Sequence, residues 1–204
     1  MAKKPPIDKA RVLKRLDRAR VGQLLVRVRR WIPDADPVDG FVVARSERWV
    51  LLARVSDGIH LDGWTALRIK DIQSVGINPD PACFEVKALQ ARGEWPPVAV
   101  ATVELTDIAT VVTTAAHSAP MVVIHLEFDR PDVCWIGSVQ EVVDGTLSLL
   151  EVNVAGGWAR KPRQFDLEDV TRVECGDSYV EALRLVAGAP PSRSEAKARR
   201  SSAE

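Results

Sequence analysis

Apolar side chains recur at two spacings along the chain, and these spacings predict both helices and strands. Between Asp8 and Ala19 the apolar residues keep a helical spacing with Arg and Lys between them, which is typical of an amphipathic helix. The stretch from Leu24 to Arg29 alternates instead, as a half-buried strand does. Gly, Pro and Asp-Gly turns mark the ends of the other predicted helices and strands. The predicted helices are 8–19, 82–92, 106–116 and 179–187, and the predicted strands are 24–29, 40–44, 49–55, 64–69, 72–77, 121–128, 134–140, 147–152, 165–167 and 170–173.

The predicted elements occur twice in nearly the same order, which indicates an internal repeat. One constant shift along the sequence places Gly40 on Gly137 and Leu52 on Leu149. The alternative is that two unrelated α+β stretches of this composition align by chance. We predict an α+β fold made by tandem duplication of a helix, about five strands in a small barrel, and a second helix. The predicted units are 1–95 and 96–188, with a disordered tail over 189–204.

Barrels are expected because the predicted strands are short. A short open sheet exposes unpaired backbone groups at its edges, and closing the sheet removes them. Packing two barrels in one chain also buries more apolar surface per residue, which helps small domains most.

Part of each half resembles the first motif of the Sm family, in which a Gly, an Asp and an Asn stand among apolar positions. The second half is similar at Gly137, at Asp144 and up to Ser148, with one residue inserted and Ser in place of Asn. A fainter copy begins at Gly40. The resemblance implies an Sm-like small barrel in each unit. The second Sm motif, Ile-Arg-Gly, is missing from both halves, so the residues with which RNA-binding members hold a base are not present. In the second half, residues 173–176 occupy the position of this motif.

The chain as a whole resembles a group of uncharacterised actinobacterial proteins. The similarity covers most of residues 20–188 and is carried by 91–97, 132–137, 169–173 and 179–183. It implies an organisation with two Sm-like units and no particular activity.

Charge is unevenly distributed although the 28 basic and 28 acidic side chains cancel. Residues 1–30 hold eleven basic and two acidic side chains, whereas residues 31–187 hold 13 basic and 24 acidic ones. A basic arm of this kind is typical of binding to an acidic partner such as nucleic acid. The alternative is that the basic helix packs on the acidic body of its own chain, and we favour this for most of the charge. Helical spacing places four candidate contacts near one face, namely Arg11, Lys14, Arg15 and Arg18.

Cysteine and histidine positions do not match a metal or catalytic motif. The three cysteines lie far apart, without zinc spacing, and are expected to be small buried side chains. His60 and His125 are each followed two positions later by a carboxylate, Asp62 and Glu127, which places two acid–base groups on one strand face. Two such groups do not make a site, so we predict no enzyme, no metal and no cofactor.

Tryptophan is unusually frequent, with six against one tyrosine. Most of the six lie on predicted strands or beside turns, and they allow two interpretations. They either pack in the core and between the barrels, which we favour, or offer stacking platforms for nucleic-acid bases. The residues are Trp31, Trp49, Trp64, Trp135 and Trp158.

The sequence therefore predicts a non-catalytic interaction module, built of two Sm-like barrels, that binds a protein partner or a second copy of itself. Binding of RNA through the basic N-terminal helix is the alternative. The chain has no apolar run long enough to cross a membrane and no apolar stretch after its first residues, so we expect a cytoplasmic protein without membrane contact.

Overall fold

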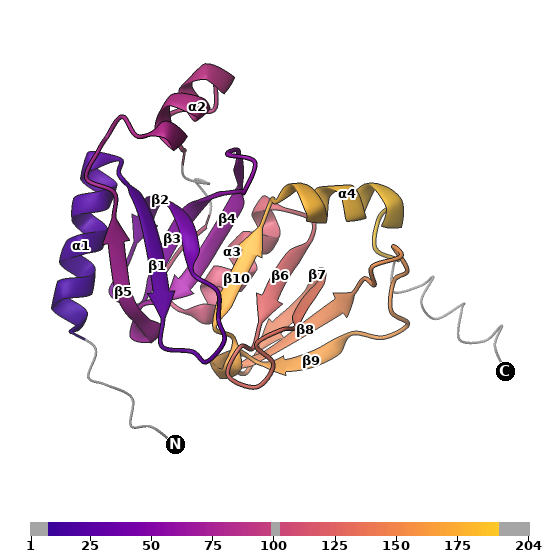
Figure 1. Cartoon of the computed structure of the whole chain (residues 1–204). Coiled ribbons are helices and arrows are strands. Elements are labelled where there is room, and N and C mark those ends of the chain that lie inside the picture. The colour runs from indigo at the N-terminus through magenta and orange to yellow at the C-terminus, as the bar shows by residue number, and fades with distance from the viewer. Residues whose placement is uncertain (1–7, 99–102, 192–204) are drawn as a thin grey trace, which may run out of the picture.

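The computed structural model describes residues 8–98 and 103–191, and its strands form one antiparallel ten-stranded sheet (Figure 1). The strand order is β5-β1-β2-β3-β4-β10-β6-β7-β8-β9. The N-terminal half of the sheet contains β1 (Leu25–Arg30), β2 (Val38–Arg45), β3 (Trp49–Val55), β4 (Leu61–Arg68) and β5 (Ile72–Ile77). The C-terminal half contains β6 (Val122–His125), β7 (Cys134–Val143), β8 (Thr146–Glu151), β9 (Arg163–Asp166) and β10 (Arg172–Cys175). The helices are α1 (Lys9–Gly22), α2 (Phe84–Arg92), α3 (Ile108–Ser118) and α4 (Ser178–Ala187), with 3₁₀ turns η1 (Ile69–Asp71) and η2 (Leu167–Asp169).

Each predicted helix and strand is confirmed, with ends that differ by at most three residues. Local side-chain chemistry explains why the helices begin where they do. The Asp8 carboxylate accepts a hydrogen bond from Arg11 N at 3.0 Å, and Asp107 and Asp177 cap α3 and α4 in the same way. Such caps satisfy backbone N–H groups that a helix leaves free in its first turn.

The prediction of two small barrels in tandem is wrong, although the mixed α+β class is confirmed. Strand β4 of the N-terminal half pairs with β10 of the C-terminal half, from Trp64 opposite Cys175 to Leu67 opposite Arg172. This pairing satisfies the backbone edges that barrel closure was expected to satisfy, so the strands form one open sheet instead of two closed units. The resemblance to the Sm fold thus gave the wrong architecture.

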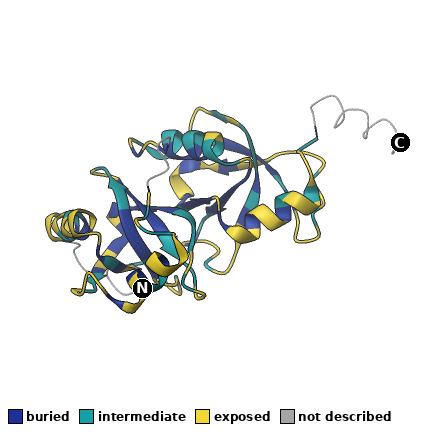
Figure 2. Cartoon of the chain, turned by 90° about the horizontal axis from the view of Figure 1, so that it is seen from above, coloured by how far each residue is buried: buried dark blue, intermediate teal, exposed yellow. Residues whose placement is uncertain are grey.

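Helices cover both faces of the sheet because alternate strand residues enter different hydrophobic clusters. In β1, Val26 joins the cluster beneath α1, whereas Leu25 joins the cluster beneath α2. In β6, Ile124 joins the cluster beneath α3, whereas Val123 joins the cluster beneath α4. Figure 2 shows the result, with buried residues gathered on the strands and exposed residues on the outer faces of the helices and in the loops.

The cluster beneath α3 crosses from one half of the sheet to the other. It contains Trp49 and Ala66 of the N-terminal half together with Leu147 and Val173 of the C-terminal half. The two halves therefore share one core, which is a further reason why the expected division into two separate barrels fails.

In the part of the chain that the structure describes, no helix is both long and apolar enough to cross a membrane. Most of the tail predicted to be disordered, residues 192–204, lies outside the described residues.

Candidate anion-binding groove

Helix α1 is docked on the sheet through its apolar face. Leu16 and Ala19 are fully buried and Val12 nearly so, all three in the cluster that lies over β1, β2 and β5. Two ion pairs add to this docking. Arg45 of β2 binds Asp17 with an Nε–Oδ1 distance of 2.9 Å, and the Lys9 ammonium lies 3.2 Å from Glu47. The basic helix therefore packs on its own chain, and the opposite face carries its cationic side chains.

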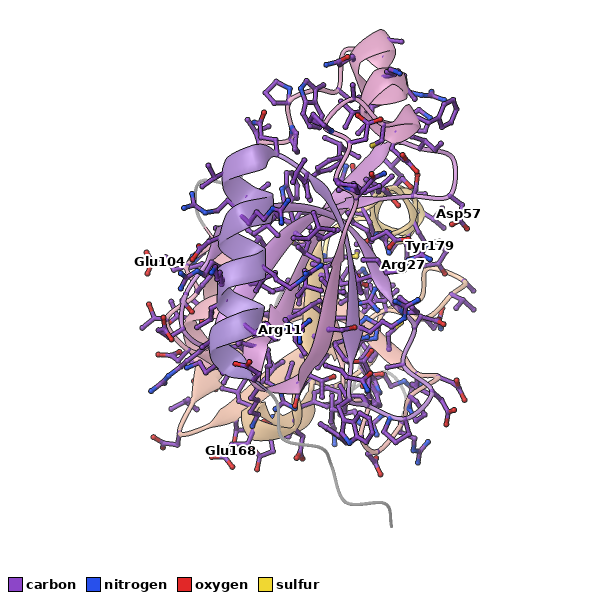
Figure 3. All side chains as sticks on the ribbon, turned by 60° about the vertical axis from the view of Figure 1, so that its left-hand side comes forward. Arg11, Arg27, Asp57, Glu104, Glu168 and Tyr179 are labelled. Atoms are coloured by element: carbon purple, nitrogen blue, oxygen red, sulfur yellow. The ribbon has the colours of Figure 1, made fainter. Side chains whose placement is uncertain are left out.

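Much of the basic charge in this region has no acidic partner within the described residues. Arg27 pairs with Asp39, and Arg30 pairs with Glu127. In contrast, five cationic side chains form neither an ion pair nor a side-chain hydrogen bond with any residue that the structure describes; they are Arg11, Lys14, Arg18, Arg20 and Arg29. Figure 3 shows Arg11 on α1, away from the paired Arg27.

Two of these free arginines line a groove between α1 and the outer strand β5. The groove has a volume of about 490 Å³, which falls within the usual range for ligand sites. Its lining comes from α1, from β5 and from the end of β1. The lining residues are Asp8, Arg11, Val12, Arg15, Arg29, Trp31, Gln73, Ser74, Val75 and Gly76.

The third arginine of the groove is Arg15, whose orientation is fixed by the edge of the sheet. Its Nε donates to the backbone oxygen of Val75 at 2.5 Å, and the side chain is half-buried. The remaining N–H groups of a guanidinium bound in this way keep their capacity to bind an anion. The acidic residue of the lining, Asp8, uses its Oδ1 to cap α1. Three arginines and one carboxylate thus line the groove, which leaves an excess of positive charge.

The four predicted contacts separate into two pairs. Arg11 and Arg15 line the groove, whereas Lys14 and Arg18 are exposed on α1 outside its lining. Sequence reasoning missed Arg29 and its neighbours on β1 and β5. The alternation of β1 shows that Arg29 points away from the core, but only the pairing of β1 with β5 places it in the lining of the groove.

Two larger hollows elsewhere on the molecule lack such an excess of positive charge. Their volumes are about 640 and 610 Å³, and both are lined by Arg68 and Lys70 together with Glu168 and Asp169. Opposite charges side by side offer no net attraction to a charged ligand. The groove beside α1 is therefore the better candidate for a binding site.

A second group of polar side chains lies where the two halves of the sheet meet. Glu174 of β10 accepts hydrogen bonds from Thr65 at 2.8 Å, from Arg172 Nε at 2.9 Å and from His125 at 3.1 Å. Burial raises the pKa of Glu174, but the hydrogen bond to His125 and the charge of Arg172 outweigh it, and the pKa lies well below its usual range. These groups satisfy one another, so we assign them a structural role.

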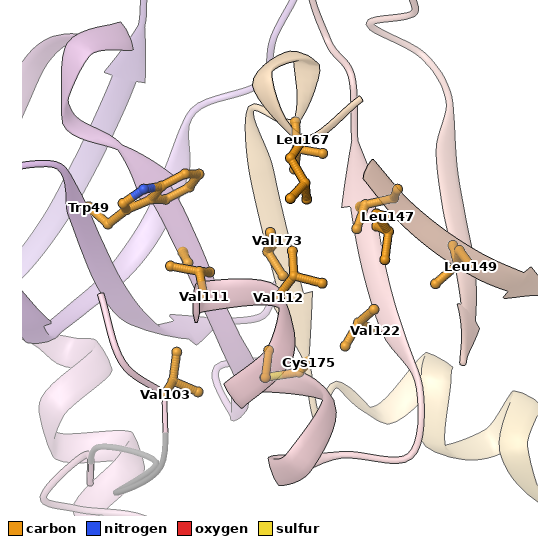
Figure 4. Close-up of a cluster of buried hydrophobic side chains, with 14 of the residues drawn as sticks. Trp49, Val103, Val111, Val112, Val122, Leu147, Leu149, Leu167, Val173 and Cys175 are labelled. Atoms are coloured by element: carbon orange, nitrogen blue, oxygen red, sulfur yellow. The ribbon is translucent and has the colours of Figure 1, made fainter. Parts of the chain in front are cut away.

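The opposite face of the same strands is apolar. Val173 and Cys175 of β10 point toward Val111 and Val112 of α3 (Figure 4). Burial raises the pKa of the Cys175 thiol to about 12, so it stays protonated at neutral pH. This face packs the junction together and offers no reactive group.

Neither His60 nor His125 forms a hydrogen bond with the carboxylate two positions further on. His60 contacts Glu94 at 2.7 Å, and Asp62 instead binds Arg54 at 2.8 Å. His125 contacts Glu174, as described above. Among residues 8–98 and 103–191, no three His, Cys, Asp or Glu side chains are arranged to hold a metal ion.

No protein-family model, curated protein or solved structure matches the chain. The resemblance to actinobacterial proteins therefore stays a prediction.

Proposed function

We propose that the protein is a non-catalytic binding module that holds an anionic chain molecule in the groove between α1 and β5. One observation carries this proposal. Arg11, Arg15 and Arg29 all line a groove of about 490 Å³, and none of the three forms an ion pair with a described residue.

The arrangement of the three arginines favours an external anion over internal pairing. Like charges held close together repel each other, and a bound polyanion removes this repulsion and releases its own counterions. The Arg15–Val75 hydrogen bond holds one guanidinium group in place before binding, and the docked apolar face of α1 fixes the backbone of Arg11. Such preorganisation lowers the entropy cost of binding.

We propose a binding function without catalysis because of the surroundings of the two candidate histidines. His60 and His125 each contact a carboxylate, as histidines in structural networks commonly do. A cytoplasmic location is part of the same proposal, and the three free cysteines fit a reducing compartment.

Binding of labelled inorganic polyphosphate tests the proposal. The variant Arg11→Gln/Arg15→Gln/Arg29→Gln should bind at least about tenfold more weakly than the natural protein at low salt. Its slope of log affinity against log salt should be smaller by about 3, since each lost phosphate contact lowers the slope by about 1.

The matched control removes three charges from α1 outside the groove. Lys14→Gln/Arg18→Gln/Arg20→Gln has the same net charge as the groove variant and should keep most of the affinity. Equal losses in both variants would show general attraction to a basic surface and would refute the groove. No binding at low salt would refute the proposal as a whole.

Self-association is a second candidate, favoured by the ends of the sheet. Strand β9 is the last strand of the order, so one of its edges is not paired with any other described strand. An unpaired edge of this kind is open to backbone pairing with a second copy, as β4 and β10 pair within the chain. Light scattering after gel filtration at micromolar concentrations tests this candidate, and a strict monomer would remove it.

A further inference from the structure

The environment of Trp31 differs from that of the other five tryptophans. Trp49, Trp64 and Trp135 belong to the cluster beneath α3, and the remaining two, Trp95 and Trp158, belong to the clusters beneath α2 and α4. Trp31 belongs to none of these clusters and is half-buried. The packing interpretation therefore explains five of the six tryptophans but not Trp31.

The indole of Trp31 has no partner among the residues described. It makes no ring contact and no hydrogen bond with them. Its backbone, in contrast, is held firmly, because its N–H donates to Asp71 O at 2.7 Å and its neighbours Arg30 and Ile32 are buried. A residue with a large flat side chain is thus fixed by its backbone in the lining of the groove.

Polar side chains with free hydrogen-bonding groups lie in the same groove. Gln73 and Ser74 of β5 are exposed, line the groove and form no side-chain hydrogen bond to another described residue. Ser74 lies opposite Arg29 in the β1–β5 register, so these two side chains share one face. The groove therefore combines cationic groups, a half-buried aromatic residue without a ring contact, and neutral hydrogen-bonding groups.

We propose that the anionic chain bound in this groove is a single-stranded nucleic acid, with a base stacked on Trp31. Its phosphates contact Arg11, Arg15 and Arg29, and Gln73 and Ser74 reach the base edges. This inference rests on the proposed function and names its ligand. A polyanion without bases leaves the indole without a partner, and a duplex hides its base faces, whereas a single strand offers both phosphates and bases.

Variants of Trp31 test the stacking directly. Trp31→Leu should weaken binding of a short oligouridylate by about tenfold, because each stacked base contributes that much or more. The same substitution should leave the affinity for inorganic polyphosphate unchanged. Trp31→Phe keeps an aromatic face and should retain most of the oligonucleotide affinity. Because Trp31 lies outside the clusters, both variants should keep the unfolding midpoint of the natural protein.

Fluorescence gives a second measurement that a purely structural role of Trp31 would not affect. Oligouridylate should quench part of the tryptophan emission of the natural protein, and this part should be missing in Trp31→Phe. An oligodeoxythymidylate of the same length, measured in parallel, shows whether RNA or DNA is preferred, and tight binding of either agrees with the proposal.

The outcomes separate this inference from the proposed function. If Trp31→Leu leaves the oligonucleotide affinity unchanged, or a duplex binds as tightly as the single strand, stacking is refuted while polyphosphate binding upholds the groove. If neither polyphosphate nor oligonucleotide binds, the proposed function fails as well.

Discussion

Replacing Arg30 with Met should destabilise the protein strongly, because the Glu127 carboxylate then stays buried without its main partner. Arg30 ends β1 and Glu127 follows β6, so this ion pair joins the two halves of the sheet. The guanidinium binds both carboxylate oxygens, with an Nη2–Oε1 distance of 2.8 Å. The two side chains are only 0% and 3% exposed, so water cannot replace either partner.

The expected magnitude follows from the contacts that remain. Removing one partner of a buried ion pair costs about 3–5 kcal/mol. Glu127 keeps the Thr171 hydroxyl at 2.7 Å and Arg172 Nη1 at 3.9 Å, so we expect the lower end, about 3 kcal/mol. The double variant Arg30→Met/Glu127→Met removes both charges, and with them the Arg30 Nε, a buried nitrogen without a hydrogen-bond partner among the described residues. It should cost less than about 1 kcal/mol.

Urea unfolding followed by circular dichroism measures both effects. With a slope of about 2 kcal/mol per molar, Arg30→Met should lower the midpoint by about 1.5 M and the double variant by less than about 0.5 M. If Arg30→Met does not fold, Glu127→Gln keeps the shape of the side chain and replaces it in the comparison. A single variant as stable as the natural protein, or a double variant less stable than the single one, would refute the reasoning.

Three further changes test other parts of the structure. Gly63→Ala should lower the free energy of unfolding by more than the roughly 1–3 kcal/mol that a strained φ alone costs, because φ is +73° and the added Cβ would also lie 2.6 Å from a backbone nitrogen. Thermal unfolding measures this loss of stability. The control Gly93→Ala, at φ +75° with nothing within 4 Å of the added Cβ, shows the cost of the strained φ alone. Lowering the pH below the usual Glu pKa of 4.5 should destabilise the protein, because the pKa of Glu174 is depressed in the folded state and the stability that its carboxylate supplies is lost as it is protonated. The urea midpoint of Glu174→Gln should therefore vary less over this pH range than that of the natural protein. Leu149→Ala should cost about 2–5 kcal/mol in the same assay, since Leu149 is fully buried, whereas Leu185→Ala, 71% exposed, should change stability by less than about 0.5 kcal/mol.

The helices and strands could be predicted because their causes are local. Asp8, Asp107 and Asp177 each cap a helix through a backbone group three residues further on. The assembly of the sheet depends on pairing between distant residues, such as Trp64 with Cys175. The local sequence pattern predicts that β4 is a strand but does not show which strand pairs with it. Two closed barrels and one open sheet are therefore equally compatible with this pattern.

The candidate groove also has some residues that local sequence predicts and others that only the pairing of distant strands brings together. Arg11 and Arg15 stand out in the sequence because they lie four positions apart on a basic helix. Trp31 and Ser74 belong to segments far apart in the sequence, and the pairing of β1 with β5 brings them to the groove. The tryptophan count indicated two interpretations, and only packing into the hydrophobic clusters separates Trp31 from the other five tryptophans.

The dual role of α1 decides which experiment can test the groove. Deleting residues 1–20 would remove the cationic side chains of the helix, but it would also remove Val12, Leu16 and Ala19 from the cluster over the sheet. Full burial of a single large apolar side chain contributes about 1.5–3 kcal/mol, so the deletion would cost a large part of the roughly 5–15 kcal/mol that keeps a domain folded. A loss of binding after deletion would then follow from unfolding alone. Substitution of the arginines keeps Val12, Leu16 and Ala19 in the cluster, and for this reason only the substitutions can separate the charge of the helix from its packing.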